Sequence, residues 1–204
     1  MKNNFCTIYL VRHGLTDWNI EGKIQGHTDI PLNTEGKNQA QELAKELRQI
    51  KFDKVYSSDL LRAKQTAEII SLEHKLEVET SMALRERNYG PYEGHQHDIL
   101  EEIDRIMDKL EEKEKYSYRH HPGMESDGEI ASRFLIYLKG IIVENPGKKI
   151  LIVSHGGVIR HSLIKLGFYP YKGYLKIDNL AYAKIESDGM NFFLKETKGI
   201  KLVF

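Results

Sequence analysis

Apolar residues gather in six short stretches of this chain, each with the length and residue types of a β-strand. Aliphatic and β-branched runs predict strands at 7–11, 54–57, 76–79 and 149–154, followed by a later pair at 181–186 and 191–195. The letters SDGM between the last two are typical of a hairpin turn. Helical patterns separate the first four strands, and this order favours a parallel sheet. We therefore expect an α/β fold: a three-layer α/β/α sandwich whose central sheet is mostly parallel and carries an antiparallel C-terminal hairpin.

Helices are predicted where apolar residues recur every three or four positions. The expected helices span 34–50, a stretch opening at SSDLLRAKQTAEII, 98–115, a segment beginning near Ser126, and 156–167. Ser58 is expected to cap the second of them, because a serine hydroxyl accepts a hydrogen bond from the first helical turn. No repeat or linker divides the chain. Residues 1–204 are therefore expected to form one domain, with the segment 94–125 as a helical cover.

Charge and composition narrow the classes of partner. Thirty basic residues balance thirty acidic ones, so no net field attracts nucleic acid or an anionic membrane surface. Cys6 is the only cysteine, which excludes an intrachain disulfide, and the apolar run before Arg12 is too short for a signal sequence or a membrane span. We expect a cytoplasmic protein. Apolar residues in the C-terminal GIKLVF are available to seal a sheet edge or an interface, so a homodimer is one expected assembly.

Two of the predicted strands end in the letters His-Gly. The run IYLVRHG delivers Arg12 and His13 to the end of the first strand, and ILIVSHGG delivers His155 to the end of the fourth. Ligands of parallel α/β sheets bind at the carboxyl ends of strands, so the two imidazoles are expected to face one another if these strands are neighbours. Arg62, in the first turn of the second predicted helix, adds a cation that calls for an anionic ligand. Phosphate fits this set of groups.

Five motifs in chain order extend this interpretation. They read LVRHGLTDWN, QGHTDIPLNTEGKNQA, VYSSDLLRAKQTA, LRERNYGPYEG and VSHGGVIR. Together they resemble the successive motifs of the histidine phosphatase superfamily, the phosphoglycerate-mutase-like proteins, over residues 8–160. The resemblance implies an enzyme that hydrolyses a small phosphorylated metabolite, a phosphomonoester, without a metal or another cofactor.

The resemblance also implies roles for particular residues. His13 would be the nucleophile that becomes phosphorylated, and Glu86, rather than the nearby Glu93, would be first the general acid and then the general base. The groups that hold the phosphoryl oxygens would be Arg12, Arg62 and His155, and the residues near the phosphate would include Asn19, Gln25 and Gly156. Fixed guanidinium and imidazole donors can stabilise the charge that a metal stabilises in other phosphoryl-transfer enzymes.

Alternatives remain open from the sequence. A phosphoglycerate mutase would return the phosphoryl group to a second substrate oxygen, but mutase members of the family look longer between the acid motif and the second histidine motif, which favours hydrolysis. A non-catalytic phosphate-binding or scaffold protein would be expected to lack the nucleophile or an arginine. Arg119 and His121, in YSYRHHPGMES, are candidates to reach a second anionic group of the substrate. The pairs at His95 and His97 and at His120 and His121 offer imidazoles, yet their spacing lacks a recognisable metal-ligand pattern.

Overall fold

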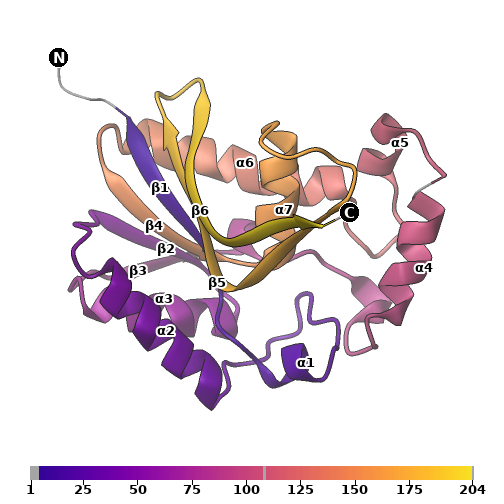
Figure 1. Ribbon diagram of the computed structural model, residues 1–204, viewed down its shortest axis with the longest axis horizontal. Coiled ribbons are helices and arrows are strands. Elements are labelled where there is room, and N and C mark those ends of the chain that lie inside the picture. Colours follow the sequence, from indigo (N-terminus) through magenta and orange to yellow (C-terminus); the bar gives the residue numbers. More distant parts are fainter. Residues whose placement is uncertain (1–4, 108, 204) are drawn as a thin grey trace.

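One six-stranded sheet organises the fold in the computed structural model, which describes residues 5–107 and 109–203. Its strands are β1 (Cys6–Arg12), β2 (Lys54–Ser58), β3 (Val78–Ser81), β4 (Lys149–Ser154), β5 (Tyr174–Ser187) and β6 (Phe192–Val203). They lie in the order β3-β2-β4-β1-β5-β6, in which the first four are mutually parallel and β5 is antiparallel to both β1 and β6. Figure 1 shows the β5–β6 hairpin in yellow beside β1. The expected mostly parallel sheet with an antiparallel C-terminal hairpin is confirmed.

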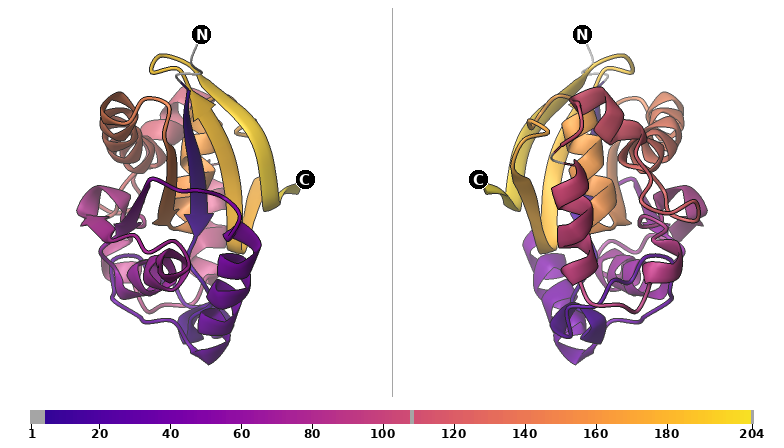
Figure 2. Two further views of the ribbon diagram at one scale, coloured as in Figure 1. Left: turned by 90° about the vertical axis from the view of Figure 1, so that its left-hand side faces the viewer. Right: turned by 90° about the vertical axis from the view of Figure 1, so that its right-hand side faces the viewer.

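Helices cover both faces of this sheet, as Figures 1 and 2 show. They are α1 (Asp17–Ile20), α2 (Thr34–Leu47), α3 (Leu61–Leu72), α4 (Asp98–Met107), α5 (Glu112–Ser117), α6 (Asp127–Glu144) and α7 (Gly156–Lys165), with two short 3-10 turns at Met82–Leu84 and Gly90–Tyr92. Buried side chains of α6 and α7 pack on one face of the sheet, and those of α2 and α3 pack on the other. The expected three-layer α/β/α arrangement is therefore present.

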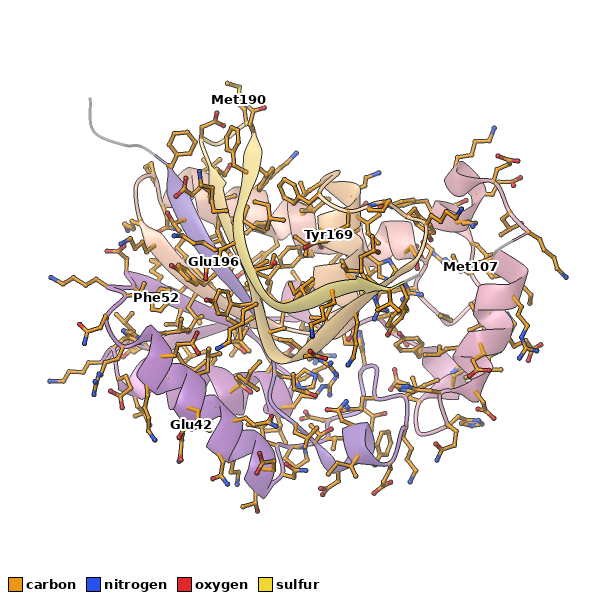
Figure 3. All side chains as sticks on the ribbon, in the orientation of Figure 1. Glu42, Phe52, Met107, Tyr169, Met190 and Glu196 are labelled. Carbon is orange, nitrogen blue, oxygen red and sulfur yellow. The ribbon has the colours of Figure 1, made fainter. Side chains whose placement is uncertain are left out.

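Alternation along β1 divides the core into two clusters. Ile8 and Leu10 point toward α6 and α7, whereas Tyr9 and Val11 point toward α2 and α3. Phe52, labelled in Figure 3, packs its ring edge-on against Tyr9 with 5.3 Å between the ring centroids. Full burial of an aliphatic side chain of this size contributes about 1.5–3 kcal/mol, so β1 is anchored on both faces and forms a rigid mount for whatever follows its last residue.

The predicted cap of the second helix is wrong. α3 begins at Leu61, and its N-cap position is Leu60, which makes no side-chain cap. The hydroxyl of Ser58 accepts a hydrogen bond from the Leu60 N–H instead, and Asp29 Oδ1 accepts from the Leu61 N–H at 2.6 Å. A carboxylate from a distant loop thus takes the place of the local serine.

The predicted helix 98–115 is two helices. α4 ends at Met107, and α5 begins anew after Glu111, whose N–H donates to the carboxylate of Glu114 in a capping box. Both hairpin strands are also longer than the predicted 181–186 and 191–195, and in β5 an irregularity interrupts the alternation of its first half. Asp108, inside the predicted helix, and Phe204, the last residue of GIKLVF, lie outside the described residues.

Candidate active site

The two His-Gly strand ends lie side by side. β1 and β4 pair in parallel with Arg12 opposite Ser154, so the next residues, His13 and His155, follow neighbouring strands. The His13 N–H continues the ladder by donating to the Ser154 carbonyl at 3.0 Å. The two imidazole rings are tilted by 60° with their centroids 5.1 Å apart. Sheet topology alone therefore brings the two histidines into one site.

His13 is held in one tautomer. Its Nδ1 lies 2.7 Å from the Gly14 carbonyl oxygen. A carbonyl only accepts, so Nδ1 carries the proton and Nε2 keeps a free lone pair. Burial, together with the charges of Arg62 and Arg12, holds the pKa of His13 well below its usual value of 6.5. The ring is consequently neutral and nucleophilic at physiological pH.

Arg62 contributes a buried cation beside this ring. Its side chain is 0 % exposed. It donates to the carbonyls of Thr28 at 2.9 Å and Gly26 at 2.7 Å. Burial lowers its pKa to about 10, a change that Glu86 partly opposes. The guanidinium is therefore charged at neutral pH and fixed in orientation by two backbone acceptors.

Several buried nitrogen atoms around His13 have no hydrogen-bond partner in the described part of the chain. They are Arg12 Nε, Arg62 Nε and both ring nitrogens of His155. Buried polar atoms are nearly always satisfied in folded proteins, and each one left unpaired costs free energy. Burial lowers the pKa of Arg12 and holds that of His155 well below 6.5, which is the response of groups that lack an anion. The arrangement fits a small oxyanion that would accept from the two guanidinium groups and from the single N–H of the neutral His155 ring.

Glu86 is oriented by two backbone N–H groups. Its Oε1 accepts from Arg87 at 2.8 Å, and its Oε2 accepts from Gly157 at 3.0 Å. A Cβ at Gly157 would collide with the Glu86 carboxylate, so the glycine permits this close approach. Glu93 is engaged elsewhere, because its carboxylate accepts from the N–H groups of His27 and Thr28, both at 2.8 Å, and so organises a loop.

A buried polar cluster stands behind Glu86. The guanidinium of Arg87 donates to Asp127 and to His161 Nε2, the latter at 2.8 Å, and the hydroxyl of Tyr171 donates to Asp127 as well. Burial lowers the pKa of His161 to about 3, so its ring is neutral and able to accept. Burial also acts to lower the pKa of Arg87, but Asp127 and other neighbours outweigh it and raise that pKa. The cluster fixes the backbone that carries Glu86.

A pocket of about 430 Å³ opens where these residues meet. The predicted residues that line it are Arg12, His13, Asn19, Gln25, Arg62, Glu86 and Gly156. His155 lies beneath them, 0 % exposed and packed against His13. A volume of this size accommodates a small metabolite. The structure therefore gathers most of the predicted site residues at one place.

Arg119 and His121 are not among the residues that line this pocket. The guanidinium of Arg119 pairs with the carboxylate of Glu129, and Nδ1 of His121 accepts from the Gly123 N–H at 3.0 Å. Both side chains are engaged within their own loop and at the start of α6. The structure thus gives no support to their predicted contact with a second anionic group.

Other pocket residues went unrecognised in the sequence. They include Lys23, Tyr89, Arg160, Lys176 and Asn179, whereas His97, which also lines the pocket, was already considered in the sequence as one of the loop imidazoles. Arg160 carried a usable signal, because it lies four positions after Gly156 and therefore on the same face of α7. Its guanidinium donates to the Leu175 carbonyl at 2.8 Å and to the Tyr174 hydroxyl at 2.6 Å, and it stacks on the Tyr174 ring. The remaining residues had no such signal, since only tertiary structure brings them to the pocket.

Within 5–107 and 109–203, no group of three or more His, Cys, Asp or Glu side chains is arranged to hold a metal ion. No helix in the same ranges has the length and apolar character needed to cross a bilayer.

Comparison with known proteins identifies the relatives of this chain. It is 38% identical over 157 residues to "Uncharacterized phosphatase PhoE" of Bacillus subtilis, covering 77% of this chain and 75% of that protein. It is 40% identical over 159 residues to "Phosphoglycerate mutase-like protein 4" of Arabidopsis thaliana, covering 77% and 69%. Among solved structures, a phosphoserine phosphatase mutant from Entamoeba histolytica, in complex with phosphoserine, superimposes with a TM-score of 0.79 at 28% identity, covering 94% of this chain and 96% of that one.

These similarities support a phosphatase activity. The sequence profile of one family, described as histidine phosphatase superfamily (branch 1), matches residues 8–198. The motifs behind the predicted resemblance lie within that span. The chain belongs to the histidine phosphatase superfamily.

Proposed function

We propose that the protein hydrolyses a small phosphomonoester through a phosphohistidine intermediate on His13, without a metal. The observation that carries this proposal is the set of unpartnered buried donors on Arg12, Arg62 and His155 around a neutral imidazole. Such donors are stabilised when a phosphoryl group accepts from them, and they are aimed before the reaction begins.

The first displacement transfers the phosphoryl group to the enzyme. His13 Nε2 attacks phosphorus with its lone pair, and the bond from phosphorus to the ester oxygen breaks. The ester oxygen keeps that electron pair and receives a proton from the Glu86 carboxyl group. Charge on the phosphoryl oxygens is stabilised by Arg12 and Arg62, whose guanidinium groups are already oriented by backbone acceptors.

The second displacement returns the enzyme to its starting state. The Glu86 carboxylate takes a proton from water as the water oxygen attacks phosphorus. The bond between phosphorus and Nε2 breaks, its electron pair returns to the imidazole of His13, and inorganic phosphate leaves. Glu86 thus serves as acid and then as base, and the cycle consumes only the ester and water.

Basic side chains of the outer pocket suggest where a second anionic group of the substrate would bind. Arg160 and Lys176 line the pocket. Lys176 is paired with Asp178 at 3.0 Å, whereas no carboxylate forms an ion pair with Arg160 among the residues described. In this proposal Arg160 therefore takes the role that was predicted for Arg119 and His121. The cytoplasmic location and the homodimer stay predictions.

Phosphate release in the presence of excess chelator tests this function. The wild type is expected to release phosphate from phosphomonoesters under these conditions, because protein donors replace the metal. Glycerol 3-phosphate and 3-phosphoglycerate form a matched pair that differs by a carboxylate, and 3-phosphoglycerate is expected to be the better substrate because of Arg160. Isomerisation of 3-phosphoglycerate, followed in parallel, separates the outcomes: isomerisation without release would indicate a mutase, and a requirement for added metal would contradict the proposed chemistry.

Stability is expected to fall as the pH drops below about 6.5, through the buried histidines. The folded-state pKa values of His13, His155 and His161 all lie below 6.5, so the unfolded chain binds more protons in this range. Above pH 6.5 these histidines are neutral in both the folded and the unfolded chain, so they do not change the free energy of unfolding. Below pH 6.5 each one lowers that free energy by about 1.4 kcal/mol per pH unit. Urea unfolding between pH 7 and pH 5 measures this slope.

A single variant checks the assignment. His155→Gln removes one titrating group. The loss of unfolding free energy per pH unit should therefore be smaller in this variant by about 1.4 kcal/mol, the contribution of one proton. Inorganic phosphate should also flatten the slope of the wild type, because a bound anion favours protonated imidazole. A free energy of unfolding that is constant from pH 6.5 to pH 5 would contradict the neutral, buried state of these rings.

A further inference from the structure

β5 contains an irregularity next to the active site. Its pairing with β6 passes from Ile177 opposite Ile200 to Tyr182 opposite Lys198, so four residues, 178–181, face the single residue Gly199. Insertions of this kind bend a strand and redirect its side chains. We name the segment 178–181 the β5 bulge.

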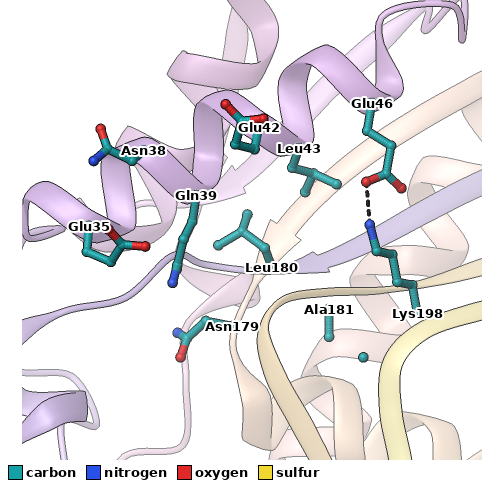
Figure 4. Close-up of a pocket in the computed structure, with 11 residues that line it drawn as sticks. Glu35, Asn38, Gln39, Glu42, Leu43, Glu46, Asn179, Leu180, Ala181 and Lys198 are labelled. Atoms are coloured by element: carbon teal, nitrogen blue, oxygen red, sulfur yellow. Dashed lines mark hydrogen bonds and ion pairs between the residues drawn. The ribbon is translucent and has the colours of Figure 1, made fainter.

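The backbone of the β5 bulge is strained. Leu180 has φ 56°, a left-handed conformation that is unfavourable for a residue with a bulky side chain. Such a conformation persists only where surrounding contacts hold it. Figure 4 shows Leu180 pointing toward α2, and Leu180 and Asn179 both line a second cavity together with Gln39 of that helix. The strained residue therefore lies in a packed environment and fixes the direction of the side chain before it.

That preceding side chain is Asn179, and it touches the nucleophile loop. Asn179 Nδ2 donates to the main-chain carbonyl of His13 at 3.1 Å and lies 3.4 Å from Asn19 Oδ1. Ile177, just before the β5 bulge, contacts the same end of β1, because its carbonyl accepts a hydrogen bond from Arg12 Nη1 at 2.5 Å. Two consecutive residues at the end of β1 are thus held by β5.

The other side of the loop is held by α2 and α3. The Leu15 N–H donates to Gln39 Oε1 at 3.3 Å, and the Gly14 N–H donates to the Thr66 hydroxyl at 3.0 Å. From the β5 side, the Asn179 side chain holds the same loop by donating to the main-chain carbonyl of His13.

We propose that Asn179 is a positioning residue for His13. By fixing the His13 carbonyl, it keeps the His13–Gly14 peptide in the orientation that lets the Gly14 carbonyl accept from Nδ1, and so it keeps the lone pair of Nε2 aimed into the pocket. Its contact with Asn19 extends the same constraint to a second pocket residue. This inference rests on the proposed function, in which His13 is the nucleophile.

Single-turnover kinetics test the positioning role. Asn179→Leu keeps a similar volume and removes the donor. With nitrophenyl phosphate, the rate of phosphohistidine formation is expected to fall about 10- to 100-fold, because small misplacements of a reacting atom have effects of this size. The affinity for inorganic phosphate, measured by calorimetry, should change less than about threefold, since Arg12, Arg62 and His155 remain in place. A variant that was only partly folded would contain less active enzyme, and its phosphate-binding capacity would fall together with its activity. It would not show a slower rate at an unchanged phosphate affinity.

Two further variants sharpen the comparison. Asn179→Asp has the same shape but places an acceptor against the His13 carbonyl and a negative charge near the phosphate, so both rate and phosphate affinity should fall. Asn38→Leu is the matched control, because Asn38 is exposed on α2 beside the second cavity and has no contact with the loop among the hydrogen bonds of the described residues. Its rate should equal that of the wild type.

A readout without turnover separates this inference from the proposed function. Imidazole ¹⁵N chemical shifts report the tautomer, so His13 should be a single Nδ1–H form in the wild type and a mixture in Asn179→Leu. A wild-type rate or an unchanged tautomer in this variant would overturn the positioning role. If the wild type formed no phosphohistidine from any ester, the proposed function would fail, and the tautomer would still decide the role of Asn179.

Discussion

His13→Ala is expected to lower kcat by a factor on the order of 10⁵ or more, because the group that accepts the phosphoryl group is lost. The imidazole is hard to replace, because its Nδ1 contact to the Gly14 carbonyl leaves the Nε2 lone pair free to attack. His155 lies close, with its ring centroid 5.1 Å from that of His13, but its role in the proposed mechanism is to donate to a phosphoryl oxygen. Phosphate release from glycerol 3-phosphate and from nitrophenyl phosphate measures the loss.

The variant should nevertheless be folded and should bind phosphate. Arg12 and Arg62 keep their backbone acceptors when the imidazole is removed. As the pH falls below 6.5, the free energy of unfolding should decrease less in the variant than in the wild type. The reason is that the variant lacks one buried histidine that must stay neutral. Circular dichroism and a phosphate-induced rise in melting temperature are the controls. A folded variant that turns over at more than a few per cent of the wild-type rate would exclude His13 as the nucleophile.

Local signals predicted the centre of the sheet well. β1 and β4 are short, buried runs that end in glycine-containing turns, and such runs are recognisable without tertiary information. The hairpin was only partly recognised, because the β5 bulge shifts the alternation between Ile177 and Tyr182. The cap of α3 was missed for a similar reason: Asp29 reaches it from another loop, and nothing in the neighbouring sequence shows this contact.

The residues of the candidate site also fall into two groups: those that local sequence predicted and those that only the tertiary structure shows. The residues at strand ends and in the quoted motifs meet in the structure because parallel pairing of β1 and β4 makes their carboxyl ends coincide. Arg160 and Asn179 enter the pocket from α7 and from a strained bulge, and their roles depend on orientation rather than on residue type. The substrate contact of Arg119 was suggested by its basic charge and stays a prediction, and in the structure its guanidinium pairs with a carboxylate of α6. Residue type predicted which chemistry was available, and only packing showed which side chains were free to perform it.

Glu86→Gln is the second variant with a large expected effect, and its size should depend on the leaving group. An alkyl ester such as glycerol 3-phosphate needs a proton on the departing oxygen, so its kcat/KM should fall about 10²- to 10⁴-fold. Nitrophenolate leaves without a proton, so kcat/KM for nitrophenyl phosphate should fall far less. The amide retains the shape of the carboxyl group and can still accept from the Gly157 N–H, which keeps the wall of the pocket in place.

The same variant also reports the second displacement. Once nitrophenolate has left, water must be activated by the residue that has been removed, so phosphohistidine should accumulate. Stopped-flow absorbance should then show a burst of nitrophenolate close to one equivalent per enzyme, followed by slow turnover. Glu93→Gln is the comparison, because Glu93 organises the His27–Thr28 loop and should slow both esters by the same factor without a burst. Equal slowing of the two esters by Glu86→Gln would show that Glu86 is not the general acid of the first displacement. A missing burst would show that it is not the general base of the second, so one variant tests both steps.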